Sequence, residues 1–195
     1  MEPLFSAVIY GCNAGLLREA LHEVYIPRIQ RGNDSFAANV LGARGPLLSV
    51  LVHFFEKGQW GSFVETVLEE QSLSAEDRLY VLMQAGQYLA AVRGLGAPGV
   101  RNCYERAEPL CHSLDRPLLQ YVALLGQWRH TLVTDNMSNA MRIAEQLYIL
   151  AQKQNHAALM IGACRALAGT FYYSGDFESA RQYARQFYLS SDLIA

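Results

Sequence analysis

The sequence predicts an all-α protein in which antiparallel helix pairs stack into a solenoid. From about residue 74, apolar residues recur every three or four positions in capped segments that are separated by short turns. Several positions also repeat about forty residues apart, as is typical of stacked helical hairpins. Alternating β-branched runs bounded by hairpin turns do not occur, so strands are disfavoured.

The first 73 residues are predicted to be helical, with no repeat that can be defined. Apolar spacing predicts one helix over residues 16–30 and a shorter helical stretch over residues 35–41. Pro46 can open a further helix that reaches about Lys57. The pattern from Ser62 to Glu65 has the form of a capping box and predicts another helix start. We expect one or two helical hairpins in this region.

Six further helices are predicted over residues 74–195, in the pairs 74–113, 117–154 and 156–190. The six span residues 74–93, 97–113, 117–133, 136–154, 156–173 and 176–190. Ser74 begins the first as an N-cap, with an acid three residues later. Pro98 and Pro117 suit first helical turns, where no N–H is needed. Thr134 or Asp135 and then Asp176 are expected to cap later helices.

Small residues recur at equivalent positions of the three pairs and are expected to pack the helices together. Gly86-Gln87-Tyr88 is echoed forty residues later by Gly126-Gln127-Trp128. In the second helix of each pair, Ala107, Ala144 and Ala184 lie 37 and 40 residues apart. This period also fits HEAT-like pairs, so it does not by itself select the type of repeat.

The last pair follows the tetratricopeptide spacing. The positions concerned are Leu167, Ala168, Phe171, Gly175, Phe177 and Ala180. Ala168 and Ala180 would let the two helices approach closely, while Phe171 and Phe177 would fill the space beside them. Gly175 would accommodate a positive-φ turn. The fold class expected is therefore a tetratricopeptide-like right-handed solenoid.

Further segments carry a family resemblance. They are residues 94–98, 103–107, 119–128, 144–147 with 150–151, and 167–184. Over about residues 75–187 the chain resembles the repeat region of large bacterial signalling ATPases of the STAND type, which often also carry an adenylate-cyclase, kinase or DNA-binding domain. The resemblance implies a sensory or regulatory role in which the repeats receive a protein or peptide partner, including an ATPase or cyclase domain. It also suggests a fragment of such an architecture. No Gly-x-x-x-x-Gly-Lys-Ser/Thr loop is present, so ATP binding is not implied.

Composition and charge exclude several function classes. The chain has 195 residues, of which 51% are hydrophobic and 17% charged, enough apolar surface for a folded core. Its formal net charge is −2 with scattered basic residues, whereas nucleic-acid-binding surfaces are normally basic. No apolar run reaches the roughly 18 residues of a membrane helix, and Glu2 is the wrong sign for a signal peptide. We expect a cytoplasmic protein that contacts neither nucleic acid nor membrane.

Candidate catalytic and metal-binding groups form no recognisable motif. The five histidines (His22, His53, His112, His130 and His156) include no pair three or four residues apart. Cys103 and Cys111 would lie about 12 Å apart on one helix, too far for a disulfide. With Cys12 and Cys164, they are expected to be free, and mostly core residues. We expect neither enzyme activity nor a metal or cofactor.

Binding is predicted in the groove lined by the first helix of each pair. Arg129, Arg165 and Tyr172 are expected there, with Tyr88 a weaker member, to bind a peptide backbone or carboxylate. Two alternatives stay open: these residues are solvated arginines and a packed tyrosine, or an apolar inter-helix pocket holds a small molecule. Phe187, Tyr188 and Leu189 predict self-association through the C-terminal helix, because terminal repeats normally carry polar caps.

Overall fold

The computed structural model describes residues 2–32, 35–134 and 137–191, with side chains as far as residue 186. The described residues are mostly helical and contain no β-strand, only one isolated antiparallel bridge between Phe55 and Phe63. The predicted all-α class is therefore confirmed. None of the helices in these ranges combines the length and apolarity needed to cross a bilayer.

The chain folds as two compact units, Met1–Arg106 and Ala107–Ala195. The division falls within helix α6 (Pro98–Ser113). The predicted division at residue 73 concerned where the repeats begin, and it stays a prediction.

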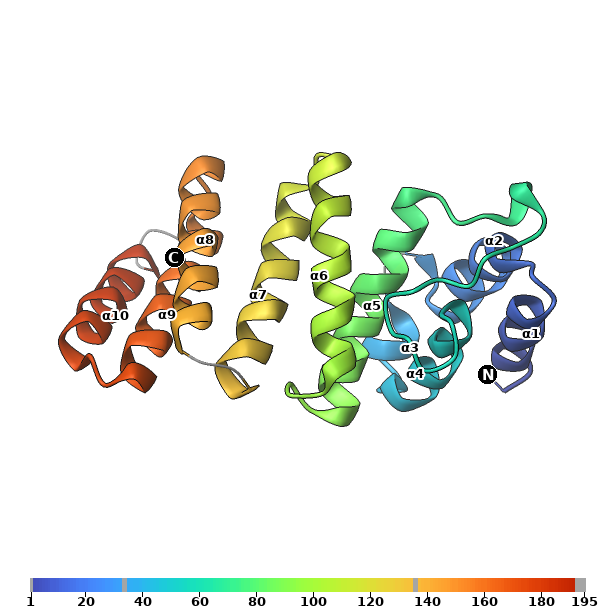
Figure 1. Cartoon of the computed structure of the whole chain (residues 1–195), viewed down its shortest axis with the longest axis horizontal. Coiled ribbons are helices and arrows are strands. Elements are labelled where there is room, and N and C mark those ends of the chain that lie inside the picture. Colours follow the sequence, from blue (N-terminus) through green and yellow to red (C-terminus); the bar gives the residue numbers. More distant parts are fainter. Residues whose placement is uncertain (1, 33–34, 135–136, 192–195) are drawn as a thin grey trace. The chain divides into compact units, whose positions relative to one another are not determined.

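The first unit begins with several short helices (Figure 1). They are α1 (Glu2–Asn13), α2 (Leu17–Glu19), η1 (Ala20–Ile29), α3 (Phe36–Asn39), α4 (Arg44–Leu51), η3 (Val52–Phe54) and η4 (Glu69–Gln71). Helix α1 is not among those predicted. The helix predicted over residues 16–30 is present, but from Ala20 it is a π-helix that contains Pro27. Its wider turn ends with the Gln30 N–H donating to the Tyr25 carbonyl, five residues back, at 3.0 Å.

The helix start predicted at Ser62 is wrong. Residues around Phe63 pair instead with the segment at Phe55, because the Glu56 N–H donates to the Ser62 carbonyl at 2.8 Å. The Phe55 ring centroid lies 4.9 Å from that of Phe63 and 5.4 Å from that of Trp60. Burial of this aromatic cluster outweighs the local preference for a helix start.

Helix α5 (Ala75–Arg93) begins with the predicted capping box. The Asp77 N–H donates to Ser74 Oγ at 3.2 Å, and the Ser74 N–H donates to Asp77 Oδ2 at 3.1 Å. The other oxygen of this carboxylate lies 2.8 Å from His22 Nε2, so the cap also ties α5 to η1. Gly86 lies in close contact with α6 (Pro98–Ser113), because a Cβ there would lie 2.9 Å from the Tyr104 ring.

In the second unit, α7 (Pro117–Thr134), α8 (Met137–Gln154), α9 (Ala157–Ser174) and α10 (Phe177–Ser191) each pack against the next (Figure 1). These bounds, like those of α5 and α6, agree with the predicted ones to within one residue. Pro98 and Pro117 are first residues of their helices, as predicted. The Asp176 carboxylate accepts from the Ser179 N–H at 3.0 Å and caps α10. Asp135 lies outside the described residues, and the Thr134 hydroxyl donates back to the His130 carbonyl at 2.7 Å.

The predicted packing residues of the second unit divide between core and surface. Gly126, Ala144, Leu167 and Ala180 are buried, and the ring of Phe171 stacks on Tyr183 with centroids 5.6 Å apart. Phe177 was expected to fill the space beside the two helices, but it is 62% exposed, because it opens α10 at the surface beside the end of α9. The side chains of Phe187, Tyr188 and Leu189 lie outside the described residues, so the predicted self-association stays a prediction.

Candidate functional site

A cavity of about 670 Å³ lies among α7, α9 and α10 of the second unit. This volume is within the usual range of about 300–1,000 Å³ for ligand sites. The lining comprises Trp128, Leu132, Arg165, Ala168, Gly169, Tyr172, Tyr173, Phe177, Ala180, Arg181 and Ala184. Most of these side chains are aromatic or small, and the two charged ones are both arginines.

The inner wall of the cavity is held by a hydrogen-bonded tryptophan. Trp128 is 9% exposed, and its indole N–H donates to Thr170 Oγ1 at 2.9 Å. Thr170 donates in turn to the Ala166 carbonyl at 2.8 Å, so the orientation of the indole is defined. Ala168 and Gly169 carry too little side chain to fill the space beside it. The apolar volume is therefore open to a group from outside.

Three exposed aromatic side chains form the rim. Tyr172, Tyr173 and Phe177 are 59%, 66% and 62% exposed. The ring centroid of Tyr172 lies 5.6 Å from that of Tyr173 and 5.6 Å from that of Phe177, both in edge-to-face geometry. Single exposed apolar residues need no explanation, but a contiguous aromatic cluster beside a cavity is typical of an interaction site.

The rim also carries positive charge. Arg181 Nη1 lies 3.9 Å from Glu178 Oε2, and because both side chains are largely exposed this ion pair is weak. Arg165 is exposed and forms no ion pair with any residue that the structure describes. An apolar cavity with two guanidinium groups is complementary to a ligand that combines an apolar group with a carboxylate.

The structure brings together two of the four predicted groove residues. Arg165 and Tyr172 both line the cavity, as the helical spacing implies. Arg129 is exposed on α7 but is not part of the lining. Trp128, Tyr173 and Arg181 were not predicted as site residues, although Arg181 follows Phe177 by one helical turn and so shares its face.

Tyr88 does not belong to this site. It lies in the first unit, is 1% exposed, and its hydroxyl accepts from Gln30 Nε2 at 3.0 Å and donates to Gln84 Oε1. The same Gln30 nitrogen donates to the Tyr25 hydroxyl at 3.0 Å. Burial raises the pKa of Tyr88 above its ordinary value of 10.0. The tyrosine that was expected in the groove is part of a buried polar network.

All four cysteines are free and buried, as expected. Burial raises the pKa of Cys12 and of Cys103 from 9.0 to about 12, and that of Cys111 to about 11. Thiols that stay protonated are poor nucleophiles and poor metal ligands. Among the residues that the structure describes, no three His, Cys, Asp or Glu side chains are grouped as metal ligands.

Comparison with known proteins adds no relative from which a function could be transferred. The resemblance to the repeat region of signalling ATPases therefore stays a prediction. No family model, no curated protein and no solved structure matches this chain.

Proposed function

We propose that the chain is a non-catalytic helical-repeat scaffold that binds a peptide segment of a protein partner in the cavity among α7, α9 and α10. The tetratricopeptide-like right-handed solenoid remains the finer description of the fold that we favour. It is supported by the consecutive packing of α7 to α10 and by the glycine turn at Gly175. The observation that carries the function is the joint presence of an open apolar cavity and two arginines at its rim.

The bound segment is expected to combine an apolar side chain with a nearby carboxylate. An aromatic or large aliphatic side chain would enter the cavity beside Trp128 and contact Tyr172 and Phe177. An acidic side chain or a terminal carboxylate would accept hydrogen bonds from Arg165 and Arg181. In the architecture that the sequence resembles, this partner belongs to a cytoplasmic bacterial regulator and includes an ATPase or cyclase domain.

The test is a fluorescence-anisotropy titration of labelled peptides in which Leu, Phe or Trp lies next to Asp or Glu. Peptides with Asn or Gln in place of the acid serve as neutral counterparts. We expect saturable binding of the acidic peptides, and a loss of about tenfold in affinity (about 1.4 kcal/mol) in each of Arg165→Gln and Tyr172→Ala. Arg129→Gln is the matched control, because it removes the same charge from α7 outside the cavity.

Equal affinity of acidic and neutral peptides would show that the arginines do not bind a carboxylate of the peptide. If Arg129→Gln weakened binding as much as Arg165→Gln, the interaction would follow the general charge of the surface and not this cavity.

A second candidate function is regulation by a small apolar carboxylate, because the cavity volume is also suitable for such a ligand. A molecule bound only to the folded state raises the midpoint of thermal unfolding in a saturable way. A metabolite that does so in the wild type and not in Arg165→Gln, while no peptide binds, would favour this candidate.

A further inference from the structure

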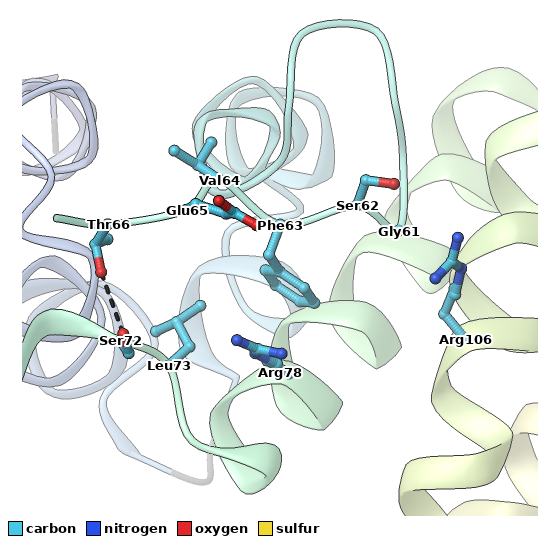
Figure 2. A pocket seen from close by; sticks show the side chains of 10 residues that line it. All are labelled: Gly61, Ser62, Phe63, Val64, Glu65, Thr66, Ser72, Leu73, Arg78 and Arg106. Atoms are coloured by element: carbon cyan, nitrogen blue, oxygen red, sulfur yellow. Dashed lines mark hydrogen bonds between the residues drawn. The ribbon is translucent and has the colours of Figure 1, made fainter. Parts of the chain in front are cut away.

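The first unit contains a second pocket, of about 480 Å³, whose lining is mainly polar. Figure 2 shows it between the extended segment over residues 61–66 and the side chains of Arg78 from α5 and Arg106 from α6. The full lining comprises Gly61, Ser62, Phe63, Val64, Glu65, Thr66, Ser72, Leu73, Arg78 and Arg106. This pocket shares no residue with the cavity among α7, α9 and α10.

The extended segment lies directly on α6 because residue 61 has no side chain. Gly61 is buried and has a φ of 96°, in the left-handed region that favours glycine. A Cβ at this position would lie 3.1 Å from Arg106 Cγ and 3.2 Å from the Asn102 carbonyl oxygen. The stem of Arg106 is thus packed against the segment, which directs its guanidinium group along the pocket edge (Figure 2).

The second arginine is positioned by an aromatic ring. The guanidinium carbon of Arg78 lies 5.8 Å from the centroid of Phe63, within the range of a cation–π contact. Phe63 is itself held by the bridge to Phe55. Two arginines from different helices are therefore brought to one pocket by neighbouring residues of the same segment.

The charges in this pocket are not balanced. Arg78 and Arg106 form no ion pair with any side chain in the described ranges, although Glu65 lines the same pocket. An excess of one positive charge remains when both arginines and this carboxylate are counted. Positive charge without a partner, gathered at a concave polar site, attracts anions.

Neutral hydrogen-bond donors accompany the arginines. Ser62, Thr66 and Ser72 line the pocket. Thr66 donates to the Leu68 carbonyl at 3.0 Å and lies 3.2 Å from Ser72 Oγ, so the hydroxyl that can still donate to a ligand is that of Ser62. The N–H of Phe63 has no acceptor among the described residues. It points away from the paired segment, because Phe55 and Phe63 form a non-hydrogen-bonded pair.

We propose that this pocket binds a phosphate monoester through Arg78 and Arg106. Guanidinium forks match the spacing of phosphate oxygens. A phosphate monoester carries a charge of roughly −1.5 to −2 at neutral pH, which is larger in magnitude than the single positive charge left over in the pocket. The pocket is larger than a phosphate group alone needs, and Phe63, Val64 and Leu73 supply apolar surface for the organic part of the ligand. Phosphorylated side chains and small phosphorylated metabolites share this chemistry.

The test is isothermal titration calorimetry on the full chain at low ionic strength. The probes are N-acetyl-O-phosphoserine amide, adenosine monophosphate and inorganic phosphate, each compared with its counterpart without phosphate where one exists. We expect at least one phosphorylated probe to bind, and neither N-acetylserine amide nor adenosine to do so. Binding of the phosphoserine probe alone identifies a modified side chain as the source, and binding of the nucleotide alone identifies a metabolite. Binding of all three shows that the phosphate group suffices.

Three variants connect the binding to the pocket. Arg78→Gln and Arg106→Gln are each expected to weaken binding about tenfold or more, whereas Arg78→Lys, which keeps the charge and loses the fork, is expected to have an intermediate effect. Arg28→Gln is the matched control, because Arg28 is exposed on η1 and does not line the pocket. All these side chains are exposed, so circular dichroism should show an unchanged fold.

Two results would overturn the proposal. One is the absence of saturable binding of every phosphorylated probe. The other is binding that both glutamine variants leave unchanged, or that Arg28→Gln weakens to the same extent, because the anion would then bind somewhere other than this pocket.

Discussion

At the scale of single residues, Tyr88 and Tyr172 show how the same side chain serves two purposes in this chain. The hydroxyl of Tyr88 is held between Gln30 and Gln84 inside the first unit, whereas Tyr172 is 59% exposed at the rim of a cavity. The Gln30 amide oxygen is buried and has no hydrogen-bond partner in the described part of the chain. The buried network therefore already contains one unsatisfied polar atom, and the loss of a further hydrogen bond should lower the free energy of unfolding.

Tyr88→Phe is expected to lower the free energy of unfolding by about 1–3 kcal/mol, because the buried Gln30 amide loses one of its two hydroxyl acceptors and the half-buried Gln84 carbonyl loses its hydroxyl donor. Tyr172→Phe should change it by less than about 0.5 kcal/mol, because the ring is at the surface. Urea denaturation of both variants beside the wild type measures the difference. Equal stability of Tyr88→Phe and the wild type would mean that water replaces the lost hydroxyl.

At the scale of elements, the turn between α9 and α10 is determined by hydrogen bonds and a glycine within a few residues of one another. Helix α9 ends in a Schellman motif, in which the Asp176 N–H donates to the Phe171 carbonyl at 3.0 Å and the Gly175 N–H donates to the Tyr172 carbonyl at 3.1 Å. Gly175 has a φ of 87°.

Hydrogen bonds from Ser179 lower the pKa of the Asp176 carboxyl. The contribution of this carboxylate to stability is therefore present above its ordinary pKa of 3.8 and is lost as the pH falls below that value.

Gly175→Ala is expected to destabilise the protein by about 1 kcal/mol, because a side chain disfavours the left-handed conformation. No heavy atom lies within 4 Å of the added Cβ, so the effect would come from backbone strain alone. Gly45→Ala is the paired control: the space around its Cβ is also open, but Gly45 lies in the first turn of α4 without a positive φ, directly before Pro46, so alanine should change stability by less than about 0.5 kcal/mol. Chemical denaturation should show a loss of stability in Gly175→Ala that Gly45→Ala does not share, and equal losses would contradict the argument.

At the scale of the whole molecule, both units contain buried thiol or phenol groups whose pKa is raised by burial. Burial raises the pKa of Cys12 and Cys103 from 9.0 to about 12, and that of Tyr80 and Tyr121 from 10.0 to about 12. Above about pH 9 the unfolded chain therefore loses protons that the folded chain retains. Because the unfolded state then binds fewer protons, the free energy of unfolding falls as the pH rises.

The midpoint of thermal unfolding is accordingly expected to fall steadily between about pH 9 and pH 12. It should be insensitive to these groups below about pH 8, where they are protonated in both states. Calorimetry across this series measures the effect, and an unchanged midpoint up to pH 11 would show that the groups are not shielded. As an independent check, Ellman's reagent at pH 8 should label the four cysteines rapidly only after denaturation.

Much of the helical framework could be predicted from the sequence because its causes are local. The capping pair of Ser74 and Asp77, the prolines that open α6 and α7, and the turn at Gly175 each act within a few residues. Apolar spacing acts over a single helix. These effects place helix ends to within one residue, and together with the pair of Arg165 and Tyr172 on one face of α9 they account for half of the predicted groove.

Tertiary structure alone decided what those helices present to their surroundings. The pattern at Ser62 begins no helix because Phe63 packs on Phe55. Tyr88 is buried, and its hydroxyl accepts a hydrogen bond from Gln30, which belongs to a distant segment. Arg78 and Arg106 reach one pocket because Gly61 lets an extended segment lie against α6. Such contacts join residues of different segments, and neither periodicity nor capping patterns contain information about them. The sequence by itself determined where this chain is helical from Ala75 onward, while packing determined which of its arginines and tyrosines are available to bind.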